Sequence, residues 1–170
     1  MGDADPDFFG GWNNTFTWKG LSLNIFFTYM YGNQVLMGQG ANLTRSAHTR
    51  GVVAEYAENA WTGPGTTNTY PRNIAGYAFN QKNSDMILFD GSFIRLRALT
   101  LAYQFPSKVL KKLNMQGLRV YLQGDNLFLL TPYPGWDPEV SNNMDPRYTW
   151  TDNLNVPQPR TFTFGVNLSF

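Results

Sequence analysis

One histidine and no cysteine are available for catalysis or metal binding in this 170-residue chain. A histidine-based catalytic triad, a multi-histidine metal site and a thiolate metal site are therefore excluded. His48 lies in a stretch without strand periodicity, and we expect it to be an exposed loop residue. The chemistry that remains is that of carboxylates, guanidinium groups and aromatic rings.

Carboxylates cluster once, in a segment rich in proline and asparagine. Asp137, Glu139 and Asp145, with Asn142 and Asn143, supply the oxygen ligands that Ca²⁺ prefers. Their spacing is not that of an EF-hand, and the run Asp-Pro-Glu is more simply a turn. A glycosidase pair of Asp137 and Glu139 would need the two carboxyl groups fixed about 5–9 Å apart in a cleft, which a loop does not provide. We predict no enzyme activity, no metal and no cofactor.

Three arginines fall on segments that alternate like strands. Arg95, Arg97 and Arg119 form a candidate basic patch, which inside the lumen of a barrel would contact a plug or an anionic substrate. The alternative is that they pair with acidic neighbours such as Asp125, as charged residues in a wall do. Both interpretations stay open at the level of sequence.

Aromatic residues in the expected loops form the second candidate group. These rings can stack on sugars, support a covering protein, or pack on one another within the loops. The residues are Trp61, Tyr133, Trp136 and Trp150.

The last eleven residues give the clearest structural signal. After Arg160 one parity is wholly apolar and the other wholly small or polar, which is the period of a strand with one apolar face. At roughly 3.3 Å per residue the strand is about 30 Å long, which suits a tilted membrane crossing. The pattern predicts a lipid-facing strand of an outer-membrane β-barrel, with an apolar face of Phe162, Phe164, Val166, Leu168 and Phe170.

Composition supports this interpretation. Aromatic residues make up 16% of the chain, as in barrels with aromatic girdles, whereas charged residues are only 15% and the net charge is +1. Nothing indicates a nucleic-acid partner. No run of about eighteen apolar residues predicts a transmembrane helix. The start has neither the basic nor the apolar region of an export signal, so we expect the chain to be the C-terminal piece of a longer protein.

Five alternating segments predict strands, and a helical pattern predicts a short helix at 49–59 within a long excursion. The phase of the third strand slips between Arg97 and Leu99, which predicts a β-bulge. Short and long connections alternate, and bacterial barrels place the short ones on the periplasmic side. The predicted strands lie near 11–19, 21–31, 92–105, 117–129 and 160–170.

The predicted fold class is all-β: an antiparallel transmembrane β-barrel segment with long extracellular loops. Five strands cannot close a barrel, since the smallest bacterial barrels have about eight. The segment therefore needs further strands. The alternative is a soluble all-β carbohydrate-binding module that uses the loop aromatics, and such a module should express without detergent.

Five stretches in order carry a family resemblance. The chain resembles the C-terminal part of SusC/RagA-type TonB-dependent outer-membrane transporters of the Bacteroidota. The stretches are 10–20, 90–106, 118–128, 133–140 and 157–170.

The resemblance implies a large barrel around an N-terminal plug, which imports glycans or oligopeptides across the cell outer membrane. Its implied partners are a SusD-like lipoprotein lid, the TonB complex and the outer-membrane lipid. Residues 1–170 would be the C-terminal portion of that barrel, without the plug domain or the TonB box. The resemblance also implies an assembly signal that the barrel-assembly machinery reads, at Phe164, Val166, Leu168 and Phe170.

Overall fold

The protein is described here from a computed structural model covering residues 2–38, 52, 54–67, 69–72, 84–111, 114–140, 150–153 and 155–170. The chain divides into two compact units. The sheet unit comprises Asp7–Tyr31, Ser92–Pro132 and Pro157–Phe170, and the loop unit comprises Met1–Pro6, Gly32–Gly91 and Tyr133–Val156. Among the described residues, no helix combines the length and the apolar character that crossing a membrane would require.

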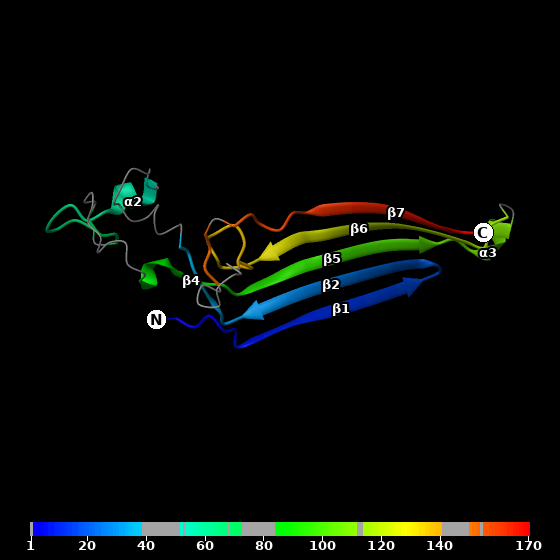
Figure 1. Cartoon of the computed structure of the whole chain (residues 1–170), viewed down its shortest axis with the longest axis horizontal. Coiled ribbons are helices and arrows are strands. Elements are labelled where there is room, and N and C mark those ends of the chain that lie inside the picture. The colour runs from blue at the N-terminus through cyan, green and yellow to red at the C-terminus, as the bar shows by residue number, and fades with distance from the viewer. Residues whose placement is uncertain are drawn as a thin grey trace. The chain divides into compact units, whose positions relative to one another are not determined.

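One five-stranded antiparallel sheet forms the sheet unit (Figure 1). Its strands follow chain order, so each pairs with its neighbour in sequence within the unit. This confirms the predicted class of antiparallel β structure. The strands are β1 Phe8–Trp18, β2 Leu21–Tyr31, β5 Phe93–Gln104, β6 Gly117–Leu130 and β7 Thr161–Ser169.

Two short connections lie at one end of this sheet. Trp18 pairs with Leu21, so Lys19 and Gly20 alone form the first turn, with φ values of 44° and 87°. Positive φ at both positions is the geometry of a type I′ hairpin. The second connection contains the short helix α3, Ser107–Leu110, which follows Pro106. The C-terminus lies at the same end of the sheet as α3 (Figure 1).

The first strand begins three residues before the predicted start. The pair Gly10-Gly11 is typical of a turn, but here both glycines lie within β1. A side chain at Gly10 would collide with the ring of Tyr29, and one at Gly11 would press on the ring of Phe26. Glycine is thus used where rings from the adjacent strand cover the backbone, and the strand continues through it.

The predicted β-bulge is confirmed at Arg97. Leu96 pairs with Phe27 and Phe128, and Ala98 pairs with Phe26, so Arg97 is skipped in the register with β2. The register with β6 shifts at the same place. Because one extra residue restores the phase, Ile94 and Leu96 share a face with Leu99 and Leu101 despite the slip in sequence parity.

The loop unit has a small core of its own. The short strands β3 Gln34–Leu36 and β4 Leu88–Asp90 pair antiparallel, which the sequence pattern did not predict. Three residues are too few to display a period. Val35, Tyr133 and Val140 form the core, with Met37 and Phe89 packed against it.

The predicted helix at 49–59 is present as α2, Ala54–Asn59. Residues 49–51 and 53 lie outside the described part of the chain, as does the candidate capping residue Thr49. The 3₁₀ helix η2, Asp85–Ile87, precedes β4.

Candidate functional surfaces: two sheet faces and the loop aromatics

Large apolar side chains cover one face of the sheet. Residues that pair directly across strands share a face, and the register aligns Phe16 with Leu23, Leu23 with Leu101, Leu101 with Leu122 and Leu122 with Phe164. Much of this face is exposed. Its strongly exposed members are Phe8, Trp12, Phe16, Trp18, Tyr31, Leu122, Phe128, Leu130, Phe162, Phe164 and Leu168.

Aromatic rings stand near both ends of this face, as the girdles of a membrane barrel do. Phe8 stacks on Tyr31 with ring centroids 5.0 Å apart at one end, and Trp18 lies at the other beside the first short turn. A soluble protein rarely exposes a continuous apolar face of this extent. The soluble carbohydrate-binding alternative would have to cover it.

The opposite face is mostly polar and internally hydrogen-bonded, with Phe9, Phe26, Met30 and Phe93 as its large apolar members. Asn24 Nδ2 donates to Asn13 Oδ1 and to Thr15 Oγ1, both at 2.8 Å. Gln123 Nε2 donates to Asp125 Oδ1 at 2.8 Å. A barrel places such a face toward its interior, so these side chains are candidates for the lumen surface.

The three candidate arginines are not gathered into one patch. Arg95 is 2% exposed, with its guanidinium 5.8 Å from the ring centroid of Phe93. Arg97 Nη1 donates to Asn126 Oδ1 at 3.2 Å, across the bulge. Arg119 pairs with Gln104, at the other end of β5 and about 30 Å along the strands from Arg95 at ~3.3 Å per residue.

The arginines therefore divide by position. Arg95 and Arg97 lie near the bulge, and Arg97 braces it through Asn126, whose φ of 53° is one of the few positive values at a non-glycine residue. Asn126 Nδ2 in turn donates to Pro159 O at 3.1 Å, which ties the bulge to the segment before β7. Arg119 is exposed at the end with the short connections.

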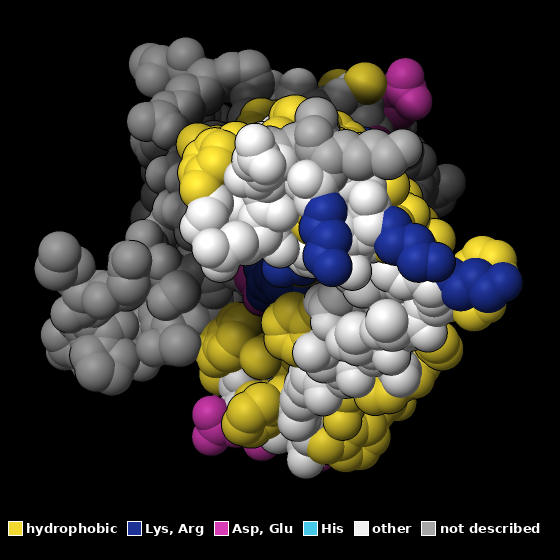
Figure 2. All heavy atoms as spheres, turned by 90° about the vertical axis from the view of Figure 1, so that its right-hand side faces the viewer, with side chains coloured by type: hydrophobic (Ala, Val, Ile, Leu, Met, Phe, Trp, Pro, Cys, Tyr) yellow, Lys and Arg dark blue, Asp and Glu magenta, His cyan; other side chains and the backbone are white. Residues whose placement is uncertain are grey.

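Figure 2 looks onto that end of the sheet and shows lysine and arginine side chains gathered there beside hydrophobic ones. Among the described residues of the two short connections, the exposed lysines are Lys19, Lys108 and Lys111. Lys19 lies 5.0 Å from the ring centroid of Trp18. A cation beside an interfacial tryptophan is typical of the boundary between hydrocarbon and water.

The candidate assembly signal lies on the apolar face. Phe164, Val166 and Leu168 pair with Leu122, Val120 and Leu118 of β6, and Phe170 follows as an exposed chain end. The structure thus shows that these four residues lie on or next to the apolar face. Their recognition by an assembly machinery stays a prediction.

The loop aromatics fall into two groups. Trp136 is 71% exposed, which leaves its ring available to a ligand or a covering protein. Trp61 is half-buried, with Arg72 5.9 Å from its ring centroid. Tyr133 is 4% exposed within the core, and Trp150 is half-buried, with its carbonyl accepting the Leu36 N–H at 2.9 Å.

Tyr133 therefore has a structural place in the loop unit. Its hydroxyl donates to Asp152 Oδ2 at 2.7 Å, and its ring meets Phe89 edge-on at 6.3 Å between centroids. Asp152 Oδ1 also accepts the Asn155 N–H at 3.2 Å. Sequence reasoning missed Asp152, since nothing local in the sequence links two residues nineteen positions apart.

We expect the loop unit to lose stability above about pH 10. Burial and the hydrogen bond to the Asp152 carboxylate raise the pKa of Tyr133 well above its ordinary value of 10.0. Above pH 10 the unfolded chain releases a proton that the folded unit retains, so the free energy of unfolding falls as pH rises. Proteolysis of the loops across pH 8–11 measures this. Tyr133→Phe should flatten the alkaline dependence, and an unchanged slope would contradict the assignment.

The carboxylate cluster is partly described. Asp137 is buried, and its Oδ1 accepts the Glu139 N–H at 3.0 Å, which is the turn predicted from the Asp-Pro-Glu run. His48, Asn142, Asn143 and Asp145 lie outside the described residues. Within the part of the chain that is described, no three metal-ligating side chains are grouped together.

An apolar outer face, a polar inner face and alternating short and long connections define a class of protein, the outer-membrane β-barrel.

No protein-family model matches the chain. Individual relatives do. The chain is 33% identical over 177 residues to TonB-dependent receptor P3 of Formosa agariphila, covering 100% of this chain and 17% of that receptor. It is 34% identical over 88 residues to TonB-dependent receptor SusC of Bacteroides thetaiotaomicron, covering 51% of this chain and 8% of SusC.

Comparison with solved structures gives the same class of relatives. The chain superimposes on the RagAB peptide transporter with a TM-score of 0.79 and 26% identity, covering 98% of this chain and 18% of that one. The chain is homologous to the C-terminal part of TonB-dependent outer-membrane receptors of the SusC and RagA type. It spans about a sixth of the length of the curated relatives that it matches from end to end. The predicted location, the cell outer membrane, is confirmed, and these homologues are receptors and transporters rather than enzymes.

Proposed function

We propose that this chain forms part of the wall of a TonB-dependent outer-membrane importer. The observation that carries the proposal is the similarity to such receptors along the whole chain, combined with a sheet whose two faces suit lipid and lumen. In this proposal residues 1–170 are the C-terminal portion of the barrel, and the plug and the TonB box belong to the rest of the receptor. The short connections lie on the periplasmic side and the loop unit lies outside the cell.

The proposed cargo is a glycan or an oligopeptide, captured together with a SusD-like lipoprotein. The RagAB structure is that of a peptide importer, which supports a peptide for the related protein and leaves both classes to be tested here. In the proposal the exposed Trp136 contacts cargo or lid, the arginines near the bulge face the lumen, and the apolar residues of β7 guide assembly of the barrel.

The test is uptake by cells that lack the intact importer and then regain it. Fluorescent oligosaccharides and oligopeptides are supplied separately, with and without a functional TonB complex. The proposal expects TonB-dependent uptake of one class, restored by the complementing gene. Equal uptake of both classes in the presence and absence of the importer would reject it.

Trp136→Ala is expected to weaken cargo capture without affecting assembly. Loss of one exposed stacking surface corresponds to about 0.5–1.5 kcal/mol, or roughly a twofold to twelvefold higher half-saturating concentration for uptake. Trp18→Ala is the matched control, because Trp18 is a tryptophan of similar exposure, 68%, beside the first short turn of the sheet unit. If the two variants take up cargo equally well, Trp136 has no role in capture.

A further inference from the structure

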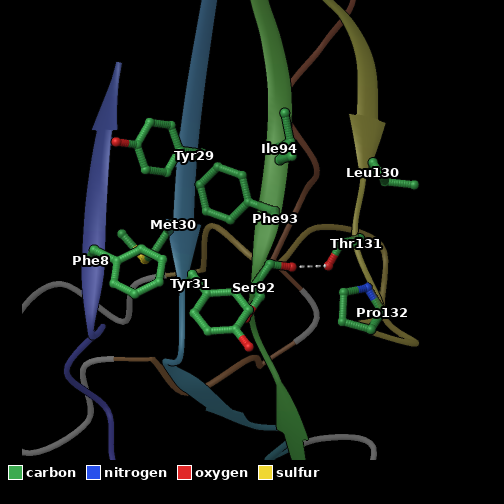
Figure 3. A pocket seen from close by; sticks show the side chains of 10 residues that line it. All are labelled: Phe8, Tyr29, Met30, Tyr31, Ser92, Phe93, Ile94, Leu130, Thr131 and Pro132. Atoms are coloured by element: carbon green, nitrogen blue, oxygen red, sulfur yellow. Dashed lines mark hydrogen bonds between the residues drawn. The ribbon is translucent and has the colours of Figure 1, made fainter. Parts of the chain in front are cut away.

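A groove of about 470 Å³ indents the sheet unit at the strand ends remote from the short connections (Figure 3). Its walls come from four adjacent strands or the residues next to them. Phe8 belongs to β1, Tyr29 and Tyr31 to β2, Ile94 to β5 and Leu130 to β6. Strands of the same sheet flank the groove, so it is not a bare edge that a further strand would fill.

Most of the groove lining lies on the apolar face, and Met30 and Phe93, which pair with each other on the opposite face, complete it. Phe8 pairs with Tyr31, Tyr29 with Ile94 and Ile94 with Leu130, so these five side chains share the face that includes Phe164. In a barrel of this class that face meets the hydrocarbon of the membrane. The groove is thus continuous with the lipid-facing surface.

The lining is chemically suited to an apolar occupant. No lysine, arginine, aspartate or glutamate is among the described residues that line it. The Thr131 hydroxyl already donates to Ser92 O at 2.7 Å, so it is engaged within the wall. The rings of Phe8 and Tyr31 stack within 10° of parallel, which gives one wall a flat and rigid surface. Figure 3 shows Phe8 and Tyr31 on one side of the groove and Leu130 and Pro132 on the other.

The volume corresponds to about fifteen water molecules at ~30 Å³ each, and a methylene group is of similar size. Water molecules in the groove would find few polar partners in its lining. An empty groove would forfeit the dispersion contacts of its lining atoms. A hydrocarbon chain needs no polar partners and restores the dispersion contacts of the lining atoms.

We propose that the groove is a binding site for one acyl chain of an outer-leaflet lipid. Both the groove and the bilayer are apolar, so transfer from water does not drive the binding. The binding is driven by close packing of the acyl chain against fixed aromatic walls, as in other contacts made within membranes. The bound chain should exchange more slowly than lipids that touch the rest of the face. This proposal requires the membrane location and, for the choice of leaflet, the proposed orientation with the short connections on the periplasmic side. It does not require the transport activity.

The experiment uses the intact outer-membrane protein that contains this chain, reconstituted in phosphatidylcholine vesicles. A small fraction of the lipid carries a photoreactive diazirine, placed in separate preparations in the upper or the lower half of one acyl chain, so that residues at both depths are within reach. After irradiation, lipid adducts are mapped by peptide mass spectrometry. We expect adducts at residues 29–31 and 128–132 to exceed those at residues 120–122, which present the same face away from the groove.

Two variants make the test specific. Ile94→Trp fills the groove and should reduce its adducts to the level of residues 120–122. Leu122→Trp is the matched control and should leave the excess unchanged, since Leu122 is 50% exposed on the same face and Ile94 is 49% exposed.

The wild-type comparison stands even if a variant fails to assemble. Equal labelling of groove and control peptides would show ordinary boundary lipid and overturn the proposal.

Discussion

Replacing Phe164 with arginine is expected to destabilise the membrane-inserted barrel by about 2–4 kcal/mol, the cost of a cation near the bilayer midplane on a lipid-facing strand. Phe164 lies in the middle of β7, is 71% exposed, and pairs with Leu122 on the apolar face. Its guanidinium replacement would have no polar partner within hydrocarbon. Urea unfolding of the intact protein in lipid vesicles measures the effect.

Thr163→Arg is the matched control for this experiment. Thr163 is the preceding residue of the same strand, is also exposed, and pairs with Gln123 on the polar face. The same cation there should cost well under 1 kcal/mol, because a lumen-facing side chain reaches water. Equal destabilisation by the two variants would mean that the apolar face does not contact lipid.

Tyr133→Ala is expected to destabilise the loop unit by about 3–5 kcal/mol, the range for truncating a buried aromatic side chain. The substitution removes a ring from the core with Val35 and Val140 and also removes the hydroxyl that donates to Asp152. Asp152 is itself buried, so the loss of that donor adds a desolvation cost. Limited proteolysis of the loop unit in the intact protein, reconstituted in lipid vesicles, reports the change.

Two control variants separate the contributions. Tyr133→Phe keeps the ring and loses the hydroxyl, so about 1–3 kcal/mol of the effect should remain. Trp136→Ala removes an exposed ring three residues away and should stay within about 0.5 kcal/mol of wild type. If Tyr133→Ala were as resistant as Trp136→Ala, the core would not depend on Tyr133.

The strands were predictable because a membrane wall imposes a strict period. Every second residue must be apolar along the whole crossing, so β7 shows its alternation without interruption and β2, β5 and β6 show it with few exceptions. The bulge was also predictable from the sequence, because one extra residue at Arg97 shifts the parity of the apolar positions. The start of β1 was not predictable, because glycines covered by rings from the neighbouring strand are indistinguishable in sequence from glycines in a turn.

The loop unit shows the opposite case. Tyr133, Trp136 and Trp150 are all aromatic and have similar proline-rich or polar neighbours. Nevertheless Tyr133 is in the core, Trp136 is exposed and Trp150 is half-buried. Burial there depends on partners such as Phe89 and Asp152, which lie far away in the chain. A short-range pattern cannot encode these contacts.

The sequence alone therefore determined the strand periodicity, the apolar face and the resemblance to TonB-dependent receptors, because each of these properties repeats locally along the chain. The tertiary structure decided which candidate residues meet. It separated Arg119 from Arg95, placed Tyr133 against Asp152, and brought Phe8, Ile94 and Leu130 around one groove. The physical reason is that strand register and loop packing set distances between residues remote in sequence, and those distances are fixed only when the chain has folded.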